Sequence, residues 1–189
     1  MSLIAMAGGA TGTGTVTLLA PITNTDRTLT LPDATGTVLT TATAGVPVNG
    51  PAVSAYKNSG SQSITTSTFT KVTFDTELFD TNSNFASSTF TPTVAGYYQV
   101  TTGLSSSGVV AQTRIILSIF KNGSVLYSPV DLSVASARYS GGALVSMNGS
   151  TDYLEIFAFI AGTSPAIESG ISGTGYNTWF QATLVRSAV

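Results

Sequence analysis

Apolar and polar residues alternate in short stretches along most of the chain, which is the pattern of β-strands with one buried face. No segment combines helix-capping residues with apolar residues at the 3.6-residue spacing of an amphipathic helix, so we expect little helix. The predicted strands span residues 52–57, 69–75, 96–104, 113–121, 124–130, 141–147, 152–160 and 176–186. Eight short strands with turn-rich links predict an all-β fold, a two-sheet jelly roll or a related sandwich.

Two Asn-Gly pairs mark turns between predicted strands. Lys121-Asn-Gly-Ser124 separates the apolar runs ILSIF and VLYS and predicts a tight hairpin, because both residues of an Asn-Gly pair accept a positive φ. Met147-Asn-Gly-Ser150 predicts a second turn, which leads into the apolar strand YLEIFAFI.

The stretch from Phe74 to Tyr98 is unusually rich in aromatic residues, with Phe at 74, 79, 85 and 90. Aromatic side chains suit a pleated, half-buried surface, so we expect this stretch to supply much of the core. Trp179 and Phe180 lie in the middle of the last predicted strand. We take eight aromatic residues as candidates for the core or for a trimer interface: Phe74, Phe85, Phe90, Tyr98, Phe157, Phe159, Trp179 and Phe180.

The first fifty residues divide into three segments. Residues 1–14 contain GGATGTG without the Lys of a phosphate-binding loop, and they predict a flexible arm. Residues 15–40 contain short alternating runs separated by turn residues and predict a short extended β segment. Residues 41–50 contain Gly and Pro without periodicity and predict a linker into a head domain over 51–189.

Residues 15–40 resemble a short segment of phage tail-fibre and other virion proteins, in which a TLTLP strand is followed by GTVLT. About 25 residues with so few apolar side chains cannot form a core alone. They would be ordered by winding around identical copies or by docking on another protein, and a disordered leader is the alternative. The candidate virion-attachment residues are Val16, Leu18, Leu19, Leu29, Leu31, Val38 and Leu39.

Charged residues make up only 8% of the chain, and the formal net charge is −2. A monomer with so few charges has an association-prone surface, so the composition favours an oligomer. No basic run is present, which argues against nucleic acid as a partner. No stretch has the roughly 18 apolar residues of a membrane span, which argues against membrane insertion. With no Cys, no disulfide can stabilise the fold.

The residue types for common catalytic chemistry are missing. The chain contains no His and no Cys, which removes the commonest general base, the thiolate nucleophile and most zinc sites, so we expect no enzyme activity and no cofactor. Asp75, Glu77 and Asp80 form one carboxylate cluster. It is a weak candidate for a calcium site or a glycosidase pair, and a solvated loop of turn-forming residues is the alternative that we favour.

Residues 51–189 also resemble the C1q/TNF-like jelly-roll domain. Phe74 is followed at the family's spacing by Asp80 and Phe85, and Phe90 is followed by Gly96 and Tyr98. Further resemblances follow in the family's order at Pro51–Tyr56, Phe120–Gly123, Gly149–Ile156 and Thr178–Val185. The chain departs from the family in a gap between Phe85 and Phe90 that is about two residues shorter, and at Val100 and Thr102, where aromatics are usual. The resemblance implies a homotrimer.

The two resemblances together predict a homotrimeric structural protein of a tailed bacteriophage virion. The protein would be a capsid decoration protein or short head fibre, attached through its N-terminal arm to capsid or tail components. A tail fibre that recognises host surface glycan or protein is the alternative, and a secreted C1q-like module ranks below both. The N-terminus lacks the basic start and long apolar run of a signal peptide, so we expect synthesis in the host cytoplasm and a location on the virion.

Overall fold

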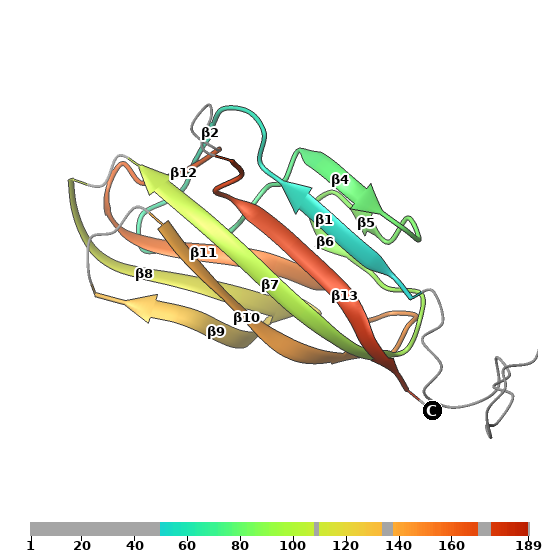
Figure 1. The fold of residues 1–189 in the computed structure, drawn as a ribbon. Coiled ribbons are helices and arrows are strands. Elements are labelled where there is room, and N and C mark those ends of the chain that lie inside the picture. Colours follow the sequence, from blue (N-terminus) through green and yellow to red (C-terminus); the bar gives the residue numbers. More distant parts are fainter. Residues whose placement is uncertain (1–49, 108–109, 134–137, 170–174, 189) are drawn as a thin grey trace, which may run out of the picture. The chain divides into compact units, whose positions relative to one another are not determined.

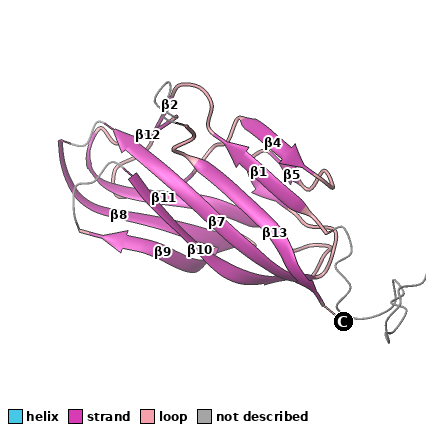
Figure 2. Cartoon of the chain, in the orientation of Figure 1, coloured by secondary structure: helices cyan, strands magenta, loops and turns pink. Residues whose placement is uncertain are grey.

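Two antiparallel β-sheets pack face to face in the part of the chain that the computed structural model describes, residues 50–107, 110–133, 138–169 and 175–188 (Figure 1). No helix occurs among these residues, as Figure 2 shows, so the predicted all-β sandwich is confirmed. None of the described segments is therefore a helix that could cross a membrane.

The first sheet has seven strands. Six of them follow the order β2-β12-β7-β13-β1-β4, and the seventh, β10, also pairs with β7. Its strands are β1 (Ala52–Tyr56), β2 (Ser61–Ser63), β4 (Thr76–Asp80), β7 (Gly96–Ser107), β10 (Arg138–Met147), β12 (Ala166–Glu168) and β13 (Trp179–Ser187). The second sheet has six strands. Five of them follow the order β5-β6-β11-β8-β9, and the sixth, β3, also pairs with β11. Its strands are β3 (Thr70–Lys71), β5 (Phe85–Ala86), β6 (Thr89–Phe90), β8 (Val110–Lys121), β9 (Ser124–Leu132) and β11 (Leu154–Thr163).

The core lies between the two sheets, and side chains that alternate along strands such as β11 and β13 help to fill it. In β7, Tyr98, Val100 and Leu104 are fully buried, whereas Tyr97 and Gln99 are exposed on the opposite face. Tyr98 donates its hydroxyl hydrogen to the Val94 carbonyl oxygen at 2.7 Å, and burial raises its pKa to about 12. The buried ring therefore stays neutral and keeps this bond at physiological pH.

Phe180 lies at the centre of an aromatic cluster in the core. Its ring centroid is 5.5 Å from that of Phe85, 6.0 Å from that of Phe74 and 6.1 Å from that of Phe90. These distances are typical of favourable aromatic pairs. The Phe-rich stretch and the last strand therefore meet in the core, and of the two roles left open for Phe180 its placement fits the core.

A second aromatic cluster covers the outer face of the six-stranded sheet. Phe157 and Phe159 alternate with the buried residues of β11, so their side chains point away from the main core. Phe120 stacks on Phe157 at 4.0 Å, and Phe69, from the loop before β3, packs against Phe120 and Phe159 at 5.5 Å. Phe157 and Phe159 thus belong to this outer cluster rather than to the central core.

Most predicted strands occur with shifted ends, but the prediction for residues 69–75 is largely wrong. Only Thr70–Lys71 pairs there, as β3, and the next long strand is β4 at residues 76–80. The Lys121–Ser124 hairpin is confirmed: Asn122 and Gly123 have φ values of 53° and 78° and connect β8 to β9. The second Asn-Gly pair forms a turn that crosses from one sheet to the other, between β10 and β11.

Asp152 ties the β8–β9 hairpin to the β10–β11 turn. Its carboxylate accepts hydrogen bonds from Asn122 Nδ2 at 2.8 Å and from the Asn148 backbone N–H at 2.9 Å, and it pairs with Lys121 Nζ at 2.8 Å. Burial alone would raise its pKa, but these donors outweigh burial and hold the pKa below its ordinary value. A carboxyl whose pKa is lower in the folded than in the unfolded protein stabilises the fold at pH values above its unfolded-state pKa, near 3.8.

The unfolding free energy should therefore stay level from pH 7 to 5 and fall below pH 4, as the pH passes through the lowered pKa of Asp152. The Asp152→Asn variant should lose about 1–3 kcal/mol at pH 7 and show a shallower fall in acid. Urea unfolding at several pH values and one protein concentration measures both effects. The exposed Glu77→Gln variant is the control. An Asp152→Asn variant with wild-type stability at pH 7 would contradict this assignment.

Candidate functional site

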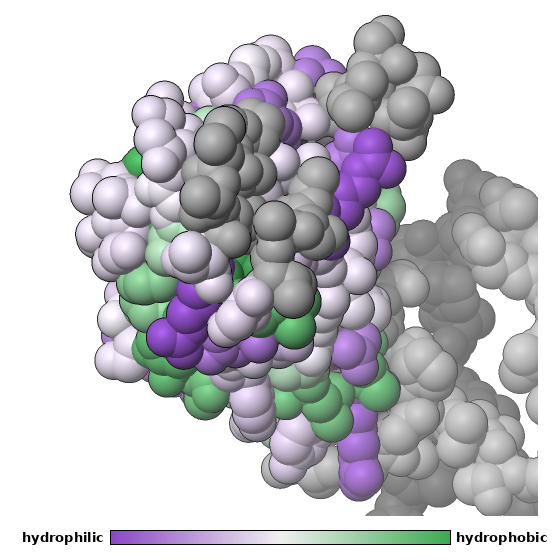
Figure 3. Space-filling model, turned by 90° about the vertical axis from the view of Figure 1, so that its left-hand side faces the viewer, coloured by the Kyte–Doolittle hydropathy of each residue, from purple (hydrophilic) through white to green (hydrophobic). Residues whose placement is uncertain are grey.

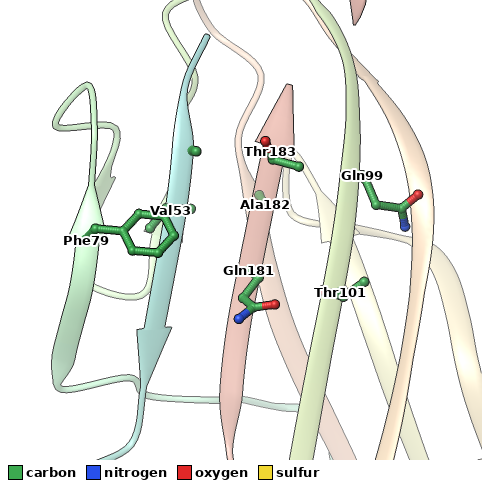
Figure 4. A pocket seen from close by; sticks show the side chains of 8 residues that line it. Val53, Phe79, Gln99, Thr101, Gln181, Ala182 and Thr183 are labelled. Carbon is green, nitrogen blue, oxygen red and sulfur yellow. The ribbon is translucent and has the colours of Figure 1, made fainter. Parts of the chain in front are cut away.

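The outward face of the seven-stranded sheet carries a groove of about 380 Å³ (Figure 4). The strand alternation that buries Phe180 and Val100 turns Gln181, Thr183 and Gln99 outward. The residues that line the groove are Ala52, Val53, Phe79, Gln99, Thr101, Gln181, Ala182 and Thr183. Phe79, from β4, forms one wall and is 51% exposed.

The central strands of this face carry almost no charge. Along β1, β7, β10 and β13, the charged residues are Arg138, which begins β10, and Arg186, near the end of β13. The outer strands of the sheet carry Glu77 and Asp80, on β4, and Glu168, on β12. The outer face of the six-stranded sheet instead carries two ion pairs, one of which joins Lys71 to Glu155 and the other Arg114 to Asp131, both at 2.7 Å. A charged face suits water, whereas depletion of charge is the compositional mark of the centre of a protein interface.

A second apolar surface lies at the edge of the sandwich, on β9. Among the described strands β9 pairs only with β8, and β10 of the other sheet packs beside it, where Pro129 contacts Gly141. We call the exposed apolar residues of β9 the edge patch: Val125, Leu126, Tyr127 and Leu132, with exposed fractions of 40–50%. The edge patch belongs to the six-stranded sheet and shares no residue with the groove, whereas the exposed Leu144 of β10 pairs with Gln99 and lies beside the groove.

The structure separates the eight aromatic candidates into three groups. Phe74, Phe85, Phe90, Tyr98 and Phe180 lie in the central core. Phe157 and Phe159 lie in the outer cluster. Only Trp179 reaches the outward face of the seven-stranded sheet, where it lines a second pocket. The core role fits the placement of the first five, and the interface role stays a prediction for Phe157, Phe159 and Trp179.

Sequence reasoning missed the groove residues. Gln99, Thr101, Gln181 and Thr183 are ordinary polar residues on a strand face, and Phe79 was one of four Phe residues expected in the core. One signal could have identified the face. Both β7 and the first seven residues of β13 contain no charged residue, although half of their side chains point away from the core.

Two of the three acidic candidates accept hydrogen bonds from backbone N–H groups. The Asp75 carboxylate accepts hydrogen bonds from the backbone N–H groups of Asn58, at 2.6 Å, and Ser59, at 3.2 Å. Burial alone would raise the pKa of Asp75, but these bonds outweigh burial and hold the pKa below its ordinary value. Asp80 accepts the Phe85 N–H at 2.8 Å, and Glu77 lies opposite Ala55 on the edge strand β4. Among the described residues, no three Asp, Glu, His or Cys side chains form a group that could hold a metal ion.

The seven candidate attachment residues, from Val16 to Leu39, lie outside the described residues. A site for virion attachment over residues 15–40 therefore stays a prediction from sequence.

No protein-family model matches the chain, and no curated protein matches it. Among solved structures, the globular domain of zebrafish complement 1qA protein is similar, with 24% identity over 74% of this chain and 99% of that one and a TM-score of 0.50. Murine APRIL at pH 5.0 has 12% identity over 72% of this chain and 99% of that one, with a TM-score of 0.49. Rabbit GITRL has 11% identity over 56% and 77% of the two chains, with a TM-score of 0.39.

The similarity to the complement domain agrees with the two antiparallel sheets and with the family spacing of Phe74, Phe85, Phe90 and Tyr98, which all lie in the core. The described part of this chain therefore has the fold of a C1q/TNF-like jelly-roll domain.

Proposed function

We propose that this chain is a homotrimeric structural protein of a tailed bacteriophage virion, a capsid decoration protein or short head fibre. Residues 15–40 attach it to the particle, and the jelly-roll head is displayed outward. The head has no catalytic role in this proposal. The observation that carries the assembly is the low charge of the central strands on the outward face of the seven-stranded sheet, with its groove.

The position of the two apolar surfaces supports a closed ring of copies. If the edge patch of one copy packs in the groove of the next, each copy uses two different surfaces. Such head-to-tail contacts close into a ring when the rotation between copies permits it. The resemblance to C1q/TNF-like domains favours three copies in that ring.

The charge distribution supports the same arrangement. Packing the groove against the edge patch covers central strands with almost no charge, so few ions lose their hydration. The face with the Lys71–Glu155 and Arg114–Asp131 ion pairs stays in water. The low overall charge of 8% is thus explained by a surface that the assembly covers.

The virion role is supported by the resemblance of residues 15–40 to phage tail-fibre and virion segments, and by where the arm enters the head. The backbone at Pro51 accepts a hydrogen bond from the Leu184 N–H at 3.0 Å, so the arm joins the head beside the end of β13. The start of β13, at Trp179, lies about 17 Å from Leu184 along the strand, given about 3.3 Å per residue. The head therefore has one end where residue 51 begins it, and an opposite end near Trp179, which we call the distal end.

The first test is the solution mass of the purified full chain by light scattering, with and without a chelator. We expect three times the chain mass of 19.3 kDa in both conditions. A stable monomer at micromolar concentration would contradict the assembly. A trimer that dissociates on chelation would instead support a calcium site between copies, with Asp75, Glu77 and Asp80 as its candidates.

The second test is location. An antibody against the head should label intact particles of the phage that encodes the chain. Removal of residues 1–40 should leave the trimer intact but abolish binding to particles. Purified particles that lack the chain would contradict the virion role.

A further inference from the structure

A second pocket, of about 240 Å³, lies at the distal end of the head. Its lining residues are Arg138, Tyr139, Ser140, Tyr176, Asn177 and Trp179. It shares no lining residue with the groove. Figure 3 looks onto this end of the domain, where hydrophilic and hydrophobic residues lie side by side on the surface.

The aromatic walls of this distal pocket are held in place by the sheet. Trp179 and Ser140 both pair with Gly103 of β7, on opposite sides. A Cβ at Gly103 would lie 2.3 Å from Trp179 Nε1, so the indole lies over the space that the missing side chain leaves. Tyr176 packs on Tyr56 of β1, with ring centroids 3.7 Å apart. Both rings are therefore positioned without a ligand, which lowers the entropy cost of binding.

The polar groups of the pocket are mainly donors. Arg138 is exposed, and the three ion pairs of the described residues involve other cations. Asn177 Nδ2 is buried and has no hydrogen-bond partner among the described residues. An unsatisfied buried donor is costly, and a ligand oxygen at that position removes the cost. The six lining residues include no carboxylate, so nothing within the lining neutralises the guanidinium.

The aromatic walls and the polar donors of the distal pocket together favour one kind of ligand. A guanidinium binds a carboxylate through two parallel hydrogen bonds, and the amide and hydroxyl groups of Asn177 and Ser140 suit sugar hydroxyls. The rings of Trp179 and Tyr176 offer apolar surface to the C–H face of a sugar ring. Drug-sized ligands occupy pockets of about 300–1,000 Å³. A pocket of 240 Å³ fits a smaller unit, such as one sugar ring.

We propose that the distal pocket binds a carboxylate-bearing sugar residue of the uronic acid type. Arg138 binds the carboxylate, Trp179 and Tyr176 contact the ring, and Asn177 donates to a ring substituent. The inference deepens the proposed outward display of the head by giving its distal end a surface glycan to bind. It does not require the trimer, because every lining residue belongs to one protomer.

The chain supplies its own reporter, because Trp179 is its single tryptophan. Titration of the full-length protein with methyl β-D-glucuronide should change the tryptophan fluorescence in a saturable way, with a dissociation constant on the order of 1 mM, as expected for a single small unit. Methyl β-D-glucoside, which lacks the carboxylate, should bind at least about tenfold more weakly.

Two variants separate the pocket from general charge effects. Arg138→Gln should weaken glucuronide binding at least about tenfold. Arg186→Gln, which removes an exposed arginine at the other end of β13, should leave it unchanged. Light scattering on the same samples shows whether assembly has changed, so a failure of this site is distinguishable from a failure of the trimer.

Three results would overturn the proposal. The first is no fluorescence response to the glucuronide up to 50-fold above the expected constant, in folded protein. The second is equal binding of glucoside and glucuronide, which would show a neutral-sugar pocket. The third is a response to acetate, or to a short peptide ending in a free carboxylate, as strong as the response to the glucuronide, which would show a plain carboxylate site.

Discussion

The Phe180→Ala variant should unfold with a free energy about 3–5 kcal/mol below that of the wild type, the cost of removing a large buried ring. Phe180 is 1% exposed, and its ring contacts Phe74, Phe85 and Phe90. These partners come from three different segments of the chain. A cavity at this position therefore removes packing that holds both sheets together, and the sandwich cannot collapse to fill it without moving several strands.

Urea unfolding, followed by circular dichroism at one protein concentration, measures this loss. Leu78→Ala is the matched control, because Leu78 is 52% exposed on the edge strand β4 and should lose no more than about 0.5 kcal/mol. Phe180→Leu, which keeps most of the buried volume, should lie between the two. Equal losses in Phe180→Ala and Leu78→Ala would contradict the placement of Phe180 in the core.

The second half of the head could be predicted from sequence because its strands are long and strongly patterned. In β11, Leu154, Ile156, Ala158 and Ile160 are buried and alternate with half-buried residues. The Asn122–Gly123 turn fixed the β8–β9 hairpin, since the left-handed conformation is accessible to both residues. In these segments, local pattern and tertiary packing point to the same structure.

The first half could not be predicted as well, because its strands are short and their pairing is non-local. β3, β5 and β6 have two residues each, too few to show a period of two. Thr70–Lys71 pairs with residues of β11 more than 80 positions later in the chain, and no local pattern encodes that contact. Phe79 resembles its neighbours in sequence, but β4 is an edge strand and turns it into the groove.

The candidate site escaped sequence analysis for a different reason. Aromatic residues drew attention, yet five of the eight candidates stabilise the central core and two the outer cluster. Half of the groove's lining residues are Gln or Thr, whose role depends on the absence of charge around them. The lack of charged residues extends over several strands, and it can be recognised only when the pairing of those strands in the sheet is known.

The Thr183→Arg variant should shift the protein from trimer to monomer at micromolar concentration, with subunit association weakened at least about 100-fold. Thr183 is exposed in the groove, where the other lining residues are uncharged (Figure 4). In the assembled protein the new guanidinium would be buried without a carboxylate partner, and such an unpaired charge costs about 3 kcal/mol or more. The substitution leaves the core unchanged, because residue 183 points away from it.

Light scattering over a range of concentrations measures this shift, and circular dichroism establishes that the variant is folded. Thr65→Arg is the matched control: the same exchange at an exposed position of the loop between β2 and β3, outside the groove and the edge patch. It should remain a trimer. A Leu126→Arg variant should dissociate like Thr183→Arg, because it places the charge on the edge patch that packs in the neighbouring groove. If Thr183→Arg remains a trimer while Leu126→Arg dissociates, the copies meet through the edge patch alone, and the groove is free for another partner.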